Sequence, residues 1–446
     1  MTHRSVPAGR RRIGRGRLLS LALAAGFIAV LFIWIWGVRN LDGLPDVGDP
    51  FDVAEARRPI VLSDDDNAYV AYADAKRKLS TFTRAFWRVD LATLTWSKSG
   101  DVVRDFVEKN HPALLTWREG SERPHELSTQ PGELAIDTIL PVVDALRSLT
   151  LLAGVQGSRH EEEGAMDEAW SWYRGMLRTS RHVGEHGVII MRVFGARTHE
   201  RAARRIIHWA ADPRVDARLL RRAFDDTLAA DTMSRPLSGS LKLEYLREIR
   251  DLEELRVMVR DVPMPGGRFG WIEKLVAATG AKVPIQKIRL HATNDVERSR
   301  RVLRLLYANW LAQVDKPAAK RAPIAIRKPT LIIYASDPAA PPAARALAPA
   351  VLDKAIDHTS LAWVMLRPDD LTSTGGHLIT RSPWEDDGIL PREPRNRAVL
   401  IVKLAAELYR REHGQFPPTA EALLGPYLKV LPEGVESDDP IPAGLD

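Results

Sequence analysis

The chain has 446 residues, of which 45% are hydrophobic and 27% are charged, so low-complexity disorder is excluded for most of its length. It contains no cysteine, which excludes disulfides, thiolate metal sites and cysteine nucleophiles. The net charge of +6 belongs to residues 1–17, which carry six arginines and no acid; taking these six from 64 leaves 58 basic residues against 58 acidic ones. Because the rest of the chain is neutral, no binding of nucleic acid is predicted.

The first predicted element is a membrane-spanning helix at residues 18–38, an uncharged apolar stretch of 21 residues. As a helix this stretch is about 30 Å long, which is the thickness of the hydrocarbon core of a bilayer. The basic tail precedes it and several aspartates follow it. The positive-inside rule therefore predicts a cytoplasmic N-terminus and a main domain that lies outside the cytoplasm, anchored to the cell membrane by a single span.

A cleaved signal peptide is the alternative interpretation of this segment. Its basic start fits, but the apolar stretch is long for a signal peptide and no small-x-small cleavage pair follows Trp36. No later segment reaches 18 uncharged apolar residues. We therefore expect a single-pass signal anchor, with the membrane as a partner of residues 18–38.

After the anchor, residues 39–62 are rich in Gly, Pro and Asp and are predicted to form a linker. Ser63 and the three aspartates that follow it are typical of a helix N-terminus, and the predicted helix runs to about residue 79. Further helices are expected to open at Asp101 and at Pro112.

The strongest helical periodicity lies between residues 141 and 261, where apolar residues recur at i, i+3 and i+4. Helices are predicted from Pro141, and then over residues 167–185, 188–211, 215–233 and 241–260, with breaks at Gly164 and Gly187. Short turns between such helices favour antiparallel neighbours. Residues 63–316 are therefore predicted to form one helical domain, a helical-hairpin array.

The C-terminal third changes in composition. Residues 317–394 are rich in Pro and Gly and are predicted to be irregular, with an apolar run at residues 331–334 as a candidate strand. Residues 395–446 begin with a helix to His413, which Gly414 ends, and Thr419 is expected to cap a short helix beyond it. The predicted fold class is all-α, with a small helical cap at the C-terminus.

Residues 164–177, GAMDEAWSWYRGML, resemble the second helix of a tetratricopeptide repeat. The turn residue Gly164, the small Ala169 and the aromatic Tyr173 stand in the spacing of that family, in which small residues let neighbouring helices approach closely. Only one such unit is present, whereas a superhelix needs three or more. A helical hairpin with one close contact explains the same residues.

Residues 404–432 resemble the region that follows the long helix of type II secretion pseudopilins. The residues that match are Tyr409, His413-Gly414, Phe416-Pro417, Tyr427-Leu428 and Leu431-Pro432. The resemblance covers about 30 residues and implies a structural unit. It departs from the family because the membrane helix lies far upstream and no prepilin-peptidase site precedes it. The whole layout is similar to uncharacterised bacterial membrane-anchored helical proteins, which implies an envelope location.

One motif carries possible chemistry. The sequence HVGEH places His182 and His186 one turn apart on a helix, with Glu185 beside them as a possible base, in the inverted order of zinc peptidases. A third ligand would have to come from a downstream glutamate, of which residues 244, 248, 253 and 254 are candidates. Against a metal site, Gly184 and Gly187 weaken the helix, and histidine is favoured near a helix C-terminus by the dipole alone.

Two functional classes follow. The first is a non-enzymatic, membrane-anchored envelope protein whose helical domain mediates interaction with a protein or peptide. The alternative is a zinc-dependent hydrolase that uses His182, His186 and Glu185. No cofactor and no catalytic residue is assigned in the first class. Arginine runs such as Arg201, Arg204 and Arg205 are interleaved with acids, which indicates a solvated helix face rather than a phosphate site.

Overall fold

The structure is a computed structural model of the chain. It describes residues 25–26, 28–29, 46–80, 93–134, 136–253, 295–316, 326–327, 330–331 and 389–437. The membrane helix predicted at residues 18–38 falls almost wholly outside these ranges. Among the described residues, no helix has both the length and the apolar character needed to cross a bilayer.

The described part of the chain is helical, as the hydrophobic periodicity predicts. Its only strands are β1 (Ile326–Arg327) and β2 (Thr330–Leu331), an antiparallel pair of two residues each. The candidate strand at residues 331–334 overlaps β2 at one residue and otherwise lies outside the described ranges. The helices of the N-terminal half are α2 (Val53–Ala56), α3 (Ala68–Lys78), α4 (Asp101–Lys109), α5 (His111–Ser121) and the 3₁₀ turn η2 (Pro131–Glu133).

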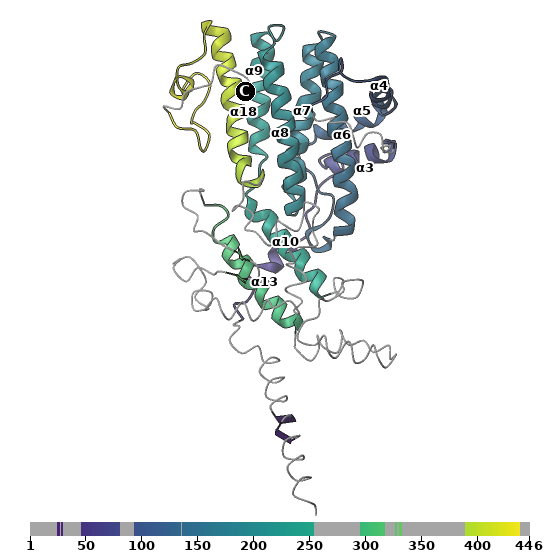
Figure 1. Cartoon of the computed structure of the whole chain (residues 1–446), viewed down its shortest axis with the longest axis vertical. Helices are drawn as coiled ribbons and strands as arrows, with labels where there is room; N and C mark the ends of the chain where they lie inside the picture. Colours follow the sequence, from purple (N-terminus) through teal and green to yellow (C-terminus); the bar gives the residue numbers. More distant parts are fainter. Residues whose placement is uncertain are drawn as a thin grey trace, which may run out of the picture.

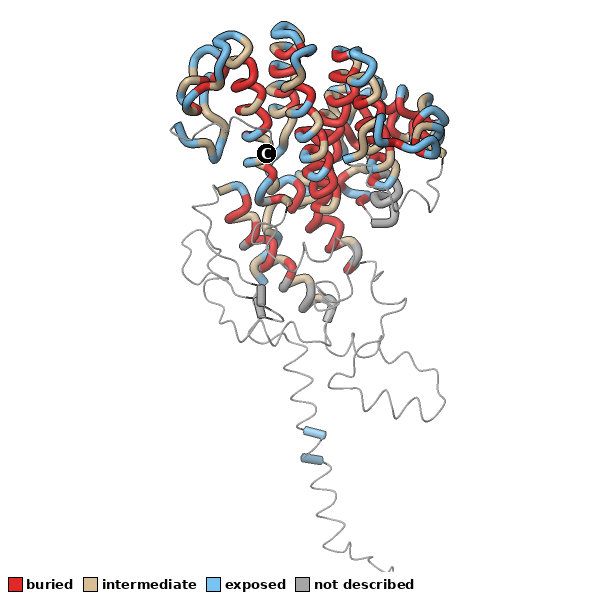
Figure 2. Tube along the Cα trace, turned by 45° about the horizontal axis from the view of Figure 1, so that its top comes forward, coloured by how far each residue is buried: buried red, intermediate tan, exposed pale blue. Residues whose placement is uncertain are grey.

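Long helices then form the body of the molecule, and they stand side by side in Figure 1. They are α6 (Ile136–Glu162), α7 (Met166–Glu185), α8 (Ile189–Ala211), α9 (Ala217–Thr232) and α18 (Ile389–His413), the last coming from the C-terminal end of the chain. α7 contacts α6, α8 and α9, and α18 packs on α8 and α9. Figure 2 shows that buried residues run along the faces that these helices turn toward one another. The helical hairpins therefore stack side by side around one core.

Two close contacts show why the long helices need small residues and large aromatics together. A methyl group on Gly195 of α8 would lie 2.5 Å from the carbonyl oxygen of Ser180 on α7, so only glycine allows the two backbones to approach this closely. Trp170 of α7 stacks on Trp209 of α8 with ring centroids 5.3 Å apart, and the Trp209 indole donates to the carbonyl oxygen of Met166.

The smaller helices cover one flank, and their start differs from the prediction. Ser63 donates to Asp66 and forms a turn, while α3 begins five residues later, at Ala68. Asn67 caps α3, because its Oδ1 accepts from the backbone N–H of Tyr69 and from that of Leu127. Asn67 is favoured over Ser63 as the cap because its side chain also accepts a hydrogen bond from the distant Leu127, whereas Ser63 bonds only within its own turn.

A second layer lies at one end of the long helices (Figure 1). It consists of α10 (Leu237–Glu253), α13 (Asp295–Leu311) and part of the predicted linker. Arg304 of α13 binds Asp46 at 2.9 Å and Asp49 at 3.0 Å, and the Tyr245 hydroxyl donates to Asp49 at 2.8 Å. Phe51 packs edge-on against the Tyr245 ring. Residues 46–51 of the linker are therefore attached to the helical domain.

Several predicted boundaries move in the structure. α6 begins at Ile136 rather than Pro141, and α18 begins at Ile389 rather than residue 395. α18 extends through Pro394 because the neighbouring Glu393 is fixed by two arginines of the body. Gly414, with φ of +77°, ends α18 as predicted. Thr419 precedes the 3₁₀ turn η5 (Ala420–Leu423), but its side chain makes no capping hydrogen bond.

Candidate functional site

The HVGEH motif lies at the C-terminal end of α7, and His182 is fully buried there. Its Nε2 lies 2.9 Å from the carbonyl oxygen of Arg123, and its Nδ1 lies 2.8 Å from the Tyr72 hydroxyl. A carbonyl can only accept, so Nε2 carries the proton and Nδ1 accepts from Tyr72; this tautomer is assigned from the partners. Burial, together with the charge of nearby Arg178, lowers the pKa of His182 to about 3, so the imidazole is neutral.

These contacts bear directly on the predicted zinc ligands. A zinc ion at His182 would have to displace one of two buried hydrogen bonds. His186 is the residue that follows the last turn of α7, is half-buried, and has its Nε2 3.8 Å from Glu185. Within the ranges that the structure describes, no three His, Asp or Glu side chains are grouped as a metal site would require.

The predicted downstream acids serve other contacts. Glu244 accepts from the backbone N–H of Ile189 at 3.0 Å, which satisfies the first turn of α8, and it also pairs with Arg247. Glu248 pairs with the same arginine. Glu254 lies outside the described residues. The described contacts of Glu244 and Glu248 therefore give no support to either as a third zinc ligand.

Glu185 connects three segments that are distant in the sequence. Its carboxylate accepts from His125 Nδ1 at 2.9 Å, from Arg235 at 3.0 Å and from the backbone N–H of Glu126 at 3.2 Å. Burial raises the pKa of Glu185, but the hydrogen bonds from His125 and Arg235 outweigh burial and lower it below its usual value. Glu185 is therefore an ionised carboxylate with its charge compensated by the protein.

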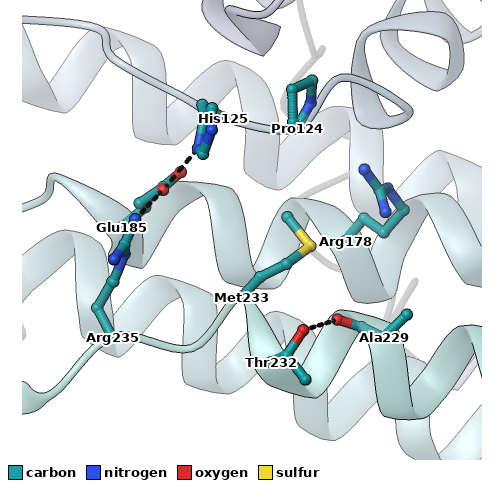
Figure 3. Close-up of a pocket in the computed structure, with 8 residues that line it drawn as sticks. All are labelled: Pro124, His125, Arg178, Glu185, Ala229, Thr232, Met233 and Arg235. Carbon is teal, nitrogen blue, oxygen red and sulfur yellow. Dashed lines mark hydrogen bonds and ion pairs between the residues drawn. The ribbon is translucent and has the colours of Figure 1, made fainter.

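A pocket of about 340 Å³ opens beside this carboxylate (Figure 3). It lies between the segment after α5, the last turns of α7, and the end of α9 with the connection to α10. Its lining consists of Pro124, His125, Arg178, Glu185, Ala229, Thr232, Met233 and Arg235. The polar groups are mostly used within the protein: Arg178 donates to the carbonyl oxygens of Ser121, Glu122 and Arg123, and the Thr232 hydroxyl donates to that of Ala229.

A second carboxyl group lies next to the pocket lining. Glu126 is 1% exposed, and its Oε1 has no hydrogen-bond partner. Burial raises the pKa of Glu126 to about 8, and the charge of Glu185 contributes in the same direction, although a hydrogen bond to Ser128 opposes both. Burial thus favours the neutral form of Glu126, whereas hydrogen bonds favour the ionised form of Glu185. The lining itself offers one carboxylate, two arginines and a histidine for hydrogen bonding, and the Thr232 hydroxyl is used for a bond to the backbone.

Sequence reasoning identified Glu185, His182 and His186 but missed the residues that surround them. Tyr72, His125, Glu126 and Arg235 reach the motif from segments at least 50 residues away. No spacing pattern marks them. The motif itself was the only sequence signal for this site.

In comparisons with known proteins, no family model, no curated protein and no solved structure matches this chain. The resemblances to tetratricopeptide repeats and to pseudopilins therefore stay predictions. The site has to be interpreted from its own geometry.

Proposed function

We propose that the chain is a single-pass, membrane-anchored envelope protein whose helical domain binds a protein or peptide partner. The observation that supports this most directly is the attachment of the linker. Asp46 and Asp49 bind Arg304, and Phe51 packs on Tyr245, so the chain joins the helical domain only a few residues after the predicted anchor. Residues 39–45 can span at most about 25 Å.

Such a short connection would hold the domain close to the membrane surface. Tethering raises the effective concentration of the domain for other components of the same membrane. A binding function also fits the chemistry of the motif, because His182 and Glu185 are used for internal hydrogen bonds that position helices and loops. The positive-inside rule predicts that the 1–17 tail lies in the cytoplasm and the helical domain on the opposite side.

The anchor is tested by fractionating cells that express the full chain. We expect the protein to resist carbonate extraction, and the domain to be digested by protease added from the extracytoplasmic side. A double variant, Ile28→Arg with Phe32→Arg, should be extracted, because each arginine at the centre of a membrane helix costs about 3 kcal/mol. A wild-type chain that is extracted by carbonate, or a domain protected with the cytoplasm, would contradict the proposal.

The zinc-hydrolase alternative is tested by metal analysis of the purified full chain. His186→Ala is the informative variant, since His182→Ala would also break the buried bonds to Tyr72 and Arg123. Stoichiometric zinc that is lost in His186→Ala would overturn the binding proposal in favour of a metallohydrolase. Equal metal content in both proteins, at trace level, would retire the HVGEH motif as a metal site.

A further inference from the structure

Four arginines gather where α6 and α8 run side by side. The two helices run in the same direction: a methyl group on Gly154 of α6 would lie 3.6 Å from Arg205 Nε of α8, and Glu161 lies 3.7 Å from His208 further along both helices. On both helices, the arginine cluster lies closer to the N-terminus than these two contacts do. Its members are Arg147 of α6 and Arg197, Arg201 and Arg204 of α8.

The four guanidinium groups have no acidic partner. None of them forms a hydrogen bond or an ion pair in the described part of the chain, whereas their neighbours do: Arg192 binds Glu393, and Arg205 donates to the carbonyl oxygen of Leu94. Glu200 is exposed and lies on the same helix at ion-pair spacing from Arg197 and Arg204, yet it pairs with neither. The acids that the sequence interleaves with these arginines therefore do not neutralise them.

Arg201 distinguishes this cluster from a solvated helix face. Its side chain is half-buried, and its Nη1 is buried without an acceptor. Burial, together with the charges of Arg147, Arg197 and Arg204, lowers the pKa of Arg201 to about 10, and the charge of Glu200 acts in the opposite direction. A buried guanidinium N–H without a partner destabilises the fold, and so does repulsion between like charges. A buried donor of this kind calls for an explanation, and an arginine cluster without acids is consistent with an anionic ligand.

The spacing of the cluster indicates the shape of its ligand. Arg197, Arg201 and Arg204 stand at i, i+4 and i+7, so they share one face of α8 and extend over about 10 Å. Arg147 widens the surface onto α6. One phosphate or one carboxylate is too small to reach the whole row, but acidic residues that repeat along a polypeptide match its length. Four arginines against Asp144 and Glu200, the acids at ion-pair spacing on the same helices, leave an excess of positive charge for such a segment.

We propose that Arg147, Arg197, Arg201 and Arg204 form a docking surface for an acidic segment of a partner protein. The inference rests on the proposed function, since it names the chemistry of the partner that the tethered domain binds. Arg201 lies in the middle of the row on α8, and its half-buried side chain offers the part that remains accessible. Arg147, Arg197 and Arg204 are exposed and supply the charge around it.

The test is fluorescence anisotropy on the detergent-solubilised full chain at physiological salt, with labelled octaglutamate as the probe. We expect octaglutamate to bind and octaglutamine not to bind. Arg201→Gln should weaken binding at least tenfold, while the unbound variant unfolds at the same or higher urea concentration than wild type. Arg218→Gln is the matched control, because Arg218 is an exposed arginine of α9 outside the cluster, and it should change the affinity less than twofold.

Three results would overturn the proposal: no binding of octaglutamate, equal binding by octaglutamine, or the same loss of affinity in Arg201→Gln and Arg218→Gln. Pyrophosphate is added as a competitor. If it binds more tightly than octaglutamate and loses affinity in Arg201→Gln, the surface is a phosphate site and the acidic-segment assignment is wrong. Carbonate extraction of the same protein tests the membrane anchor independently of the docking surface. If the protein is extracted, the anchor proposal fails while the peptide-binding result still stands. If octaglutamate does not bind, the docking proposal fails while the anchor proposal still stands.

Discussion

At the scale of single residues, buried polar groups of this protein act as links between distant segments. His182 connects Tyr72 of α3 to the carbonyl of Arg123 through its two ring nitrogens. Glu185 joins His125 to Arg235 in the same region. The residues of a motif that resembles a metal site thus hold loops and helices together, and their protonation states are part of the stability of the fold.

The raised pKa of Glu126 predicts how the free energy of unfolding depends on pH. The unfolded chain loses this proton near pH 4.5, whereas the folded protein keeps it up to a pKa of about 8, because burial favours the neutral acid. The folded state therefore binds more protons in this window, and the free energy of unfolding falls as the pH rises, by at most about 1.4 kcal/mol per pH unit. Buried His182 and His199 have the opposite effect on the free energy of unfolding, because burial lowers their pKa values. Below pH 6.5 these histidines take up protons in the unfolded chain but not in the folded one, so stability falls as the pH falls.

The interval from pH 6.5 to 8 isolates the effect of Glu126. We expect urea unfolding of the wild type to show a falling free energy across this interval, and Glu126→Gln to remove most of the slope. Glu133→Gln changes an exposed carboxylate and should keep the wild-type slope. An unchanged slope in Glu126→Gln would mean that this carboxyl is ionised in the folded protein.

At the scale of elements, the C-terminal helix α18 is held to the body by one buried ion-pair network. Glu393 binds Arg181 of α7 at 3.1 Å and Arg192 of α8 at 3.0 Å, and the three side chains are 6%, 2% and 8% exposed. Arg181 also contacts His199 at 2.8 Å. Because one carboxylate neutralises two buried guanidinium groups, this contact sets the position of α18 against α7 and α8.

Glu393→Gln keeps the size of the side chain but leaves both arginines without a countercharge. Breaking one side of a buried ion pair costs about 3–5 kcal/mol, so we expect the free energy of unfolding to fall by that amount. The pair between Asp167 and Arg222 is exposed on both sides, and Asp167→Asn should cost less than about 1 kcal/mol. Equal effects in the two variants would show that Glu393 does not hold α18.

At the scale of the whole molecule, the layer of α10 and α13 joins the linker to the body. Arg304 holds Asp46 and Asp49 from the far side of a sequence gap of more than 250 residues. These ion pairs are half-exposed, so they add little to global stability. Their effect is to fix Asp46 and Asp49 against the helical domain.

Release of the linker is measured by limited proteolysis. In Arg304→Gln we expect a protease that cleaves before aspartate to cut at residues 46–52 several times faster, because the ordered segment loses its two ion pairs. The unfolding midpoint should stay close to that of the wild type. Arg300→Gln on the same helix removes only a pair with Glu297 and should leave the cleavage rate unchanged. Slow cleavage in Arg304→Gln would mean that Phe51 and Tyr245 suffice to hold the linker.

Local patterns alone were enough for much of the secondary structure. The helices over residues 167–185 and 188–211 agree within one residue with α7 and α8, and Gly164 and Gly414 take the positive φ angles expected at helix ends. Boundaries failed where a distant residue supplied a contact. Asn67 displaced Ser63 as the cap of α3 because it also binds Leu127, and Glu393 extended α18 past Pro394 because it binds two arginines of the body.

The sequence by itself determined the all-α class and the main helix breaks, because helical periodicity, caps and glycine turns depend on residues a few positions apart. Only the tertiary structure decided what the charged and polar residues do. It surrounded Glu185 with His125 and Arg235, and it brought Arg147 near the arginines of α8, where no ion pair to an acid forms within the described ranges. Contacts of this kind join residues 50 to 60 positions apart, and burial shifts the pKa values of their members. Neither the long-range contacts nor the effect of burial can be predicted from a pattern of neighbouring residues.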